Sequence, residues 1–147
     1  MANREGTYKR PTAMSSFRRD WLDNRGWGYD IDWVMTDSDG NPYALVEDKH
    51  GVGRSASRGQ AHMYKVIADA LEIPAFQLNY TPATSSSGGH EYAGFEFVVK
   101  PLNAYARCVF RHKDEVVLSA SLYKELELGL RERKRGLCSA CKSEVVA

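Results

Sequence analysis

The segment from Asp30 to His50 decides the fold, and its sequence is DIDWVMTDSDGNPYALVEDKH. Residues 30–36 and 43–50 are rich in apolar, β-branched and aromatic residues, which predicts two strands. The connection between them, residues 37–42, consists of Asp, Ser, Asp, Gly, Asn and Pro, which are residue types that favour turns. We therefore predict a β-hairpin.

Outside the hairpin, the sequence predicts three helices and two further strands. The clearest helix is a segment near Arg58 to Ile73, in which apolar residues recur at helical spacing until Pro74 ends it. The other elements are predicted over residues 15–26 (helix), 76–80 (strand), 95–99 (strand) and 122–135 (helix with a basic last turn), with a Ser- and Gly-rich loop over residues 81–90. This order predicts the α/β class, in its mixed α+β form, with a central mixed β-sheet flanked by helices.

The composition is that of an ordinary globular domain. The chain has 147 residues, of which 43% are hydrophobic and 27% charged, and its formal net charge is +1. We expect a single domain over residues 1–136 and a tail over residues 137–147. The chain opens without a hydrophobic signal segment and has no long apolar run, so the expectation is a cytoplasmic protein without a membrane partner.

Charge is distributed unevenly around the hairpin. Residues 30–48 contain six acids and no Lys or Arg, whereas residues 49–65 contain four basic residues, two histidines and no acid. An acidic cluster can bind a cation, and a basic stretch beside it can bind phosphates. The alternative interpretation is two solvated surfaces of opposite charge.

Three side chains of the hairpin are expected to share one face. Glu47 and Lys49 are two positions apart on the second strand and therefore point to the same side, and Asp32 on the first strand can lie beside Glu47. Asp48 points to the other side. Two carboxylates about 4 Å apart repel each other by roughly 4 kcal/mol at an effective dielectric constant near 20, so a cation between them is favoured. Mg²⁺ is suited to such a site because it prefers oxygen ligands.

These residues resemble the core motif of the PD-(D/E)XK nuclease superfamily. That motif is an Asp on one strand, followed on the next strand by an acid, any residue and Lys, and here it is Asp32 and then Glu47-Asp48-Lys49. A second acid-x-Lys match, residues 132–134, lies in a charged helix end without a strand around it. Gln60 and Tyr64, four apart on the predicted helix, are similar to the Gln-x-x-x-Tyr signature of the RecB-like branch.

The resemblance implies a restriction-endonuclease-like core and a phosphodiesterase that acts on DNA. It implies that Asp32 and Glu47 bind Mg²⁺ or Mn²⁺ and that Lys49 assists the attacking water. The usual Pro before the first Asp is replaced by Ile31, and Asp30 is a further candidate for the metal site. Four residues are candidates for substrate binding: Gln60, Tyr64, Arg54 and Arg58. The small size suits a phage-type enzyme in a bacterial or phage-infected cell, and a homodimer would allow cleavage of two strands.

The three cysteines raise a separate question. Cys138 and Cys141 have the C-x-x-C spacing of metal ligands, and Cys108 with His112 could complete a tetrahedral zinc site. The simpler expectation is a frayed tail with free thiols.

Two functional hypotheses follow from the sequence. The first is a Mg²⁺-dependent DNA nuclease, acting as an exonuclease or an endonuclease. The second is a non-catalytic nucleic-acid-binding or adaptor protein on the same fold, in which the basic segments bind the partner and the acids have a structural role.

Overall fold

The computed structural model describes residues 30–51, 53–81, 94–133, 137–139 and 141–142. The chain divides into two compact units, residues 1–30 and 31–147, and all the elements below belong to the second unit. The helix predicted over residues 15–26 and residues 82–90 of the predicted loop lie outside the described residues. One domain over residues 1–136 stays a prediction.

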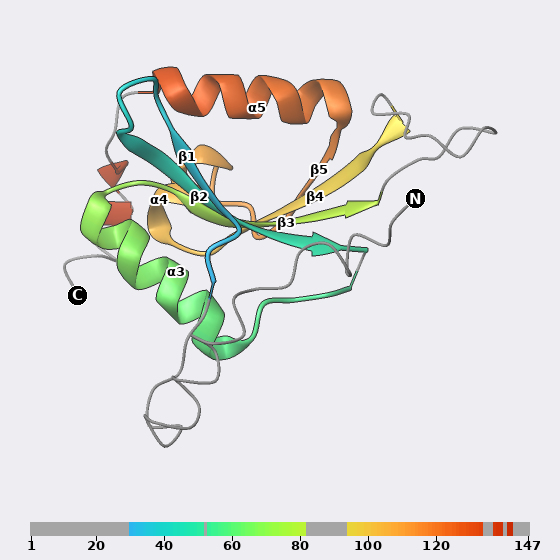
Figure 1. Ribbon diagram of the computed structural model, residues 1–147, viewed down its shortest axis with the longest axis horizontal. Coiled ribbons are helices and arrows are strands. Elements are labelled where there is room, and N and C mark those ends of the chain that lie inside the picture. The colour runs from blue at the N-terminus through green and yellow to red at the C-terminus, as the bar shows by residue number, and fades with distance from the viewer. Residues whose placement is uncertain (1–29, 52, 82–93, 134–136, 140, 143–147) are drawn as a thin grey trace, which may run out of the picture. The chain divides into compact units, whose positions relative to one another are not determined.

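Five strands form one mixed sheet in the spatial order β1-β2-β3-β4-β5 (Figure 1). β2 and β3 are parallel, and the other neighbouring pairs are antiparallel. A parallel pair needs a crossover connection, which here contains helix α3. The strands are Trp33–Thr36 (β1), Pro42–His50 (β2), Ala75–Thr81 (β3), Glu96–Pro101 (β4) and Val116–Ser119 (β5), and the helices are Arg58–Leu71 (α3), Ala104–Val109 (α4) and Ala120–Glu132 (α5).

The predicted hairpin is formed by β1 and β2. Its turn is held by the Asp37 carboxylate, which accepts hydrogen bonds from the backbone N–H groups of Asp39 and Asn41, each at 2.9 Å. Gly40 in the same turn has a φ of 83°, a conformation that glycine adopts readily. The first strand begins at Trp33 rather than at residue 30, so it is shorter than the sequence predicts.

Helix α3 covers one face of the sheet. It begins after the N-cap Ser57, whose hydroxyl accepts a hydrogen bond from the Gln60 N–H, and it ends at Leu71, slightly before the predicted end. A small core lies between this helix and the sheet and comprises Leu45, Tyr64, Ala68, Ile73 and Ala75. The odd-numbered residues of β2 and β3 face this side because side chains alternate along a strand.

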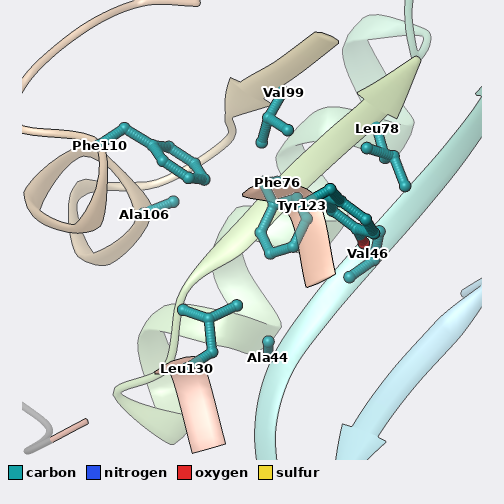
Figure 2. Close-up of a cluster of buried hydrophobic side chains, with 9 residues drawn as sticks. All are labelled: Ala44, Val46, Phe76, Leu78, Val99, Ala106, Phe110, Tyr123 and Leu130. Carbon is teal, nitrogen blue, oxygen red and sulfur yellow. The ribbon is translucent and has the colours of Figure 1, made fainter. Parts of the chain in front are cut away.

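The opposite face carries the main hydrophobic core, which packs against α4 and α5. Figure 1 shows α3 and α5 on opposite sides of the sheet. The core residues come from three strands, from both helices and from the C-cap of α4 (Figure 2): Ala44, Val46, Phe76, Leu78, Val99, Ala106, Phe110, Tyr123 and Leu130. Both faces of the central strands are therefore covered.

Two short elements, α4 and β5, are not predicted by the sequence. The buried Asn103 caps α4 by accepting a hydrogen bond from the Ala106 N–H at 2.9 Å. Its side chain also accepts from the Ala75 N–H at 3.0 Å and donates to the Ile73 carbonyl at 2.8 Å. Asn103 thereby ties α4 to the start of β3.

The predicted fold class is confirmed at the level of a mixed sheet with flanking helices. The restriction-endonuclease-like core stays a prediction. Among the described residues, no helix has both the length and the apolar character needed to cross a membrane.

Candidate functional site

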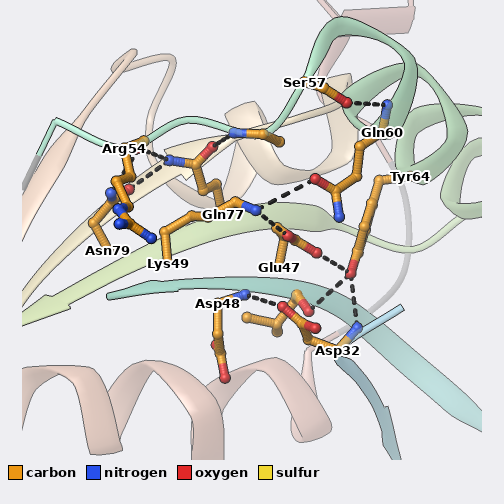
Figure 3. Close-up of polar contacts among 12 residues, drawn as sticks. Asp32, Glu47, Asp48, Lys49, Arg54, Ser57, Gln60, Tyr64, Gln77 and Asn79 are labelled. Atoms are coloured by element: carbon orange, nitrogen blue, oxygen red, sulfur yellow. Dashed lines mark hydrogen bonds and ion pairs between the residues drawn. The ribbon is translucent and has the colours of Figure 1, made fainter. Parts of the chain in front are cut away.

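Asp32, which directly precedes β1, lies beside Glu47 of β2 (Figure 3). The register pairs Trp33 with Val46, so the preceding residue, Asp32, falls beside Glu47. The Asp48 N–H donates a hydrogen bond to Asp32 Oδ2 at 2.9 Å, which holds the Asp32 carboxylate against β2. The structure thus brings together the two acids that the sequence selects.

Glu47 is a buried charge with a partner on each carboxylate oxygen. Its side chain is 2% exposed, Oε1 lies 2.6 Å from Lys49 Nζ, and Oε2 accepts a hydrogen bond from the Tyr64 hydroxyl at 2.6 Å. Lys49 is 22% exposed, so its ammonium reaches the surface of the site. Burial of an ionised carboxylate is tolerated only where such partners compensate for lost hydration.

Tyr64 has a different environment from the one the sequence suggests. It is fully buried, and its hydroxyl also accepts a hydrogen bond from the Asp32 N–H at 2.9 Å. A side chain so enclosed does not reach a substrate. The predicted substrate contact is therefore corrected to a positioning residue that fixes both acids.

Gln60 lies one helical turn before Tyr64 and is half-buried. Its Oε1 is 3.4 Å from Lys49 Nζ, which is longer than an ordinary N–H···O hydrogen bond. Gln60 and Tyr64 thus project from the same side of α3 toward Lys49 and Glu47 respectively (Figure 3). The predicted contact of Gln60 with substrate stays a prediction.

The surroundings change the acidity of two of these groups. Burial raises the pKa of Asp32, and the neighbouring Glu47 carboxylate raises it further, whereas the Asp48 N–H and Lys49 act in the opposite direction. Burial and the bond to Glu47 also raise the pKa of Tyr64, so its hydroxyl keeps its proton and remains a donor. Desolvation is thus the main cause of the raised pKa of Asp32, and repulsion between the two carboxylates adds to it.

Three further predicted site residues, Asp30, Arg54 and Arg58, are exposed. Arg54 lies in the loop before α3, and Arg58 is the first residue of that helix. Asp30 is also exposed and belongs to the first of the two units, so its part in metal binding stays a prediction.

Sequence reasoning does not find Gln77 and Asn79, two buried polar residues of β3. The register places Gln77 beside Glu47 and Asn79 beside Lys49. Both donate hydrogen bonds to the Arg54 carbonyl, at 2.9 Å and 2.7 Å, and Gln77 Oε1 accepts from the Ala56 N–H at 2.8 Å. These bonds fasten the loop that leads from Lys49 to α3. The alternation of polar and apolar residues in β3 was the available signal.

Asp48 lies on the other face of the sheet, as the strand parity predicts. Its carboxylate accepts a hydrogen bond from Trp33 Nε1 at 2.6 Å, and burial raises its pKa. It lines an apolar hollow beside α5 together with Leu78, Tyr123 and Glu127. The hollow contains none of Asp32, Glu47 and Lys49, so it is separate from the carboxylate pair.

The structure also gathers the four candidate ligands of a soft metal. The side chains of Cys108, His112, Cys138 and Cys141 meet in one cluster, and Cys141 is buried. The three cysteines are free, and the expectation of a frayed tail over residues 137–147 stays a prediction.

The donor set around Asp32 and Glu47 fits a hard divalent cation. It offers carboxylate oxygens from β2 and from the residue that precedes β1, with an ammonium beside them that carries a compensating charge. Comparisons of the chain with protein-family models, with curated proteins and with solved structures found no match.

Proposed function

We propose that this chain is a Mg²⁺- or Mn²⁺-dependent nuclease that hydrolyses phosphodiester bonds in DNA. The observation that carries the proposal is the convergence of Asp32, Glu47 and Lys49 at one point of the sheet. The resemblance to the PD-(D/E)XK motif supports the same conclusion.

Asp32 and Glu47 would hold the metal ion through their carboxylate oxygens. When bound, the ion would supply a Lewis acid that polarises the phosphate and acidifies water. The ion would also relieve the repulsion that raises the pKa of Asp32.

Lys49 contributes a positive charge at the edge of the site. Its ammonium is held 2.6 Å from Glu47 Oε1 and is partly accessible. In that position it would stabilise the attacking water as it loses a proton and the negative charge that builds on the phosphate in the transition state. Tyr64 and Gln60 would keep Glu47 and Lys49 in place through their bonds to these two groups.

The start of α3 offers a surface for the DNA backbone. The first turn of the helix contains no acid, and Arg58 and the preceding Arg54 are exposed there. The N–H groups of a helix N-terminus favour anions. Since Gln60 of the same turn lies near Lys49 Nζ, a phosphate bound at this surface would be close to the carboxylate pair.

The test is incubation of the purified protein with supercoiled, linear duplex, single-stranded and four-way-junction DNA, in Mg²⁺ and in EDTA. We expect cleavage only with the metal ion. Glu47→Gln and Lys49→Ala should each lower the rate by about 10²-fold or more, because each removes a charge that the transition state requires.

Two exposed residues provide matched controls for these variants. Asp39→Asn alters an acid in the hairpin turn, and Lys124→Ala alters a lysine on α5, so neither should change the cleavage rate. Cleavage that persists in EDTA, or that survives both Glu47→Gln and Lys49→Ala, would rule out the proposed mechanism. Metal-independent binding without cleavage would favour the non-catalytic alternative.

A further inference from the structure

A second cluster of metal-binding side chains lies where the end of α4 meets the segment that follows α5. Cys108 is in the last turn of α4, and His112 lies shortly after the helix. Cys138 and Cys141 come from the C-terminal segment. The ligand atoms of all four residues lie within 4.8 Å of one another. None of these residues contributes to the carboxylate pair, so the cluster is a separate candidate site.

Three of the separations among the ligand atoms are close to those expected around a single tetrahedral metal ion, to which His112 would contribute one of its two ring nitrogens. The Cys108 and Cys138 sulfurs are 3.5 Å apart, the Cys138 sulfur is 3.3 Å from His112 Nε2, and the Cys141 sulfur is 3.6 Å from His112 Nδ1. Metal–sulfur bonds of about 2.3 Å in a tetrahedron place two sulfurs roughly 3.8 Å apart. The observed separation is well beyond a disulfide bond of about 2.05 Å, and all three cysteines are unpaired.

The backbone around His112 also requires an explanation. Arg111 and His112 have φ values of 53° and 63°, so two consecutive residues other than glycine adopt the left-handed conformation. This conformation is unfavourable for residues with a Cβ atom. The His112 N–H donates to the Arg107 carbonyl at 2.7 Å, which folds the chain back onto α4 and brings the imidazole to Cys138 and Cys141.

A backbone hydrogen bond also joins the two described stretches that carry Cys138 and Cys141. The Lys142 N–H donates to the Cys138 carbonyl at 3.0 Å, which closes a turn around the C-x-x-C spacing. The turn brings both sulfurs to the same imidazole. Cys138 is exposed and Cys141 is buried, so the cluster lies at the surface with one side enclosed.

We propose that Cys108, His112, Cys138 and Cys141 bind one zinc ion with a structural role. Three thiolates and an imidazole are soft and borderline ligands that suit Zn²⁺ and not Mg²⁺. Four protein ligands fill the tetrahedron and leave no open position for a substrate. The ion would join α4 to a segment some 30 residues later in the chain and would stabilise the fold when the ligands are brought together.

The first test is the metal content of the full chain, purified under reducing conditions from zinc-containing medium and passed over a column without chelator. We expect one equivalent of zinc per chain by elemental analysis. Replacement of zinc by Co²⁺ should give the intense visible bands of tetrahedral cobalt and the near-ultraviolet bands of cobalt–thiolate bonds. Octahedral cobalt, or a chain without zinc whose thiols are reduced, would overturn the proposal.

The second test assigns the ligands. His112→Asn and Cys138→Ser should each weaken zinc binding roughly tenfold or more, measured by competition with a chromogenic chelator. Cys138→His retains a ligand and should recover much of the affinity. His62→Asn alters an exposed histidine on α3 and serves as the matched control. Unchanged zinc affinity in both His112→Asn and Cys138→Ser would contradict the assignment.

Discussion

The hydroxyl of Tyr64 connects the two acids of the candidate site. It donates to Glu47 Oε2 at 2.6 Å and accepts from the Asp32 N–H at 2.9 Å, and the side chain is fully buried. A single group thus fixes the backbone of one acid and the carboxylate of the other. Since a metal site depends on the orientation of its ligands, we expect Tyr64 to influence activity without contacting DNA.

Tyr64→Phe tests this positioning role. Loss of the hydroxyl removes a partner from Glu47 and from the Asp32 N–H, so the free energy of unfolding should fall by about 1–3 kcal/mol. Metal affinity and cleavage rate should each fall about 10- to 100-fold. Urea denaturation measures the first effect, and metal titration with a nicking assay measures the second.

Tyr123→Phe is the matched control for that variant. The Tyr123 hydroxyl donates to Glu127 Oε1 at 2.5 Å on the opposite face of the sheet. Its removal should lower stability without a comparable loss of metal affinity. Equal losses of metal affinity in the two variants would show that Tyr64 acts only through global stability.

At the scale of single residues, the sequence predicts which face of the sheet a side chain occupies better than it predicts which residues that side chain contacts. Glu47 and Lys49 share a face because side chains alternate along a strand, which a two-residue period shows directly. The pairing of Asp32 with Glu47 depends on the hairpin register, which the turn sets. The contact between Tyr64 and Glu47 joins a helix to a strand across 17 positions, and no local pattern reports such a contact.

The loop between β2 and α3 connects the strand and the helix that carry most of the site residues. Gln77 and Asn79 hold it through the Arg54 carbonyl and the Ala56 N–H, and Asn79 also donates to the Gly51 carbonyl at 3.0 Å. The loop therefore sets the position of α3, and with it Gln60 and Tyr64, relative to Lys49 and Glu47.

Asn79→Ala should loosen this loop. The carbonyls of Gly51 and Arg54 lose a donor, so amide hydrogen exchange at Ala56 and in the first turn of α3 should become faster than in the wild type. Exchange mass spectrometry measures the effect, with Asn41→Ala in the distant hairpin turn as control. If Asn79→Ala lowers the free energy of unfolding but amide exchange at Ala56 stays as slow as in the wild type, the role of Asn79 in holding the loop would be contradicted.

Elements with strong local signals are predictable here, and short ones are not. The periodic apolar positions of α3 and the turn residues of the hairpin give two elements close to their observed bounds. Helix α4 has six residues and depends on Asn103, whose hydrogen-bond partners in β3 and α3 lie 28 to 34 positions away. Strand β5 has four residues and is defined by pairing with β4, which is a non-local property.

At the scale of the whole second unit, the two faces of the sheet differ in chemistry. One face is filled by the apolar core beneath α4 and α5. The other is apolar toward one end of α3 and polar where Glu47, Lys49, Gln77 and Asn79 gather beside Tyr64. Packing of the apolar core keeps the strands rigid. The charged side chains at the polar end are therefore held in fixed positions.

The same unit combines two kinds of candidate metal ligand. The pair Asp32 and Glu47 offers oxygen, and the cluster of Cys108, His112, Cys138 and Cys141 offers sulfur and nitrogen. Composition and spacing are enough to suggest both donor sets. That the C-x-x-C turn meets α4 depends on the left-handed backbone at Arg111 and His112, which the residue types there do not predict.

The central claim is that Asp32 and Glu47 form one divalent cation site, and a calorimetric titration of the DNA-free protein with Mn²⁺ tests it most directly. We expect wild type and Asp39→Asn to bind alike and Asp32→Asn and Glu47→Gln to bind roughly tenfold or more weakly. Wild-type affinity should also fall as the pH is lowered, because a proton competes for Asp32, whose pKa is raised. Equal Mn²⁺ affinity in wild type, Asp32→Asn and Glu47→Gln would contradict the claim.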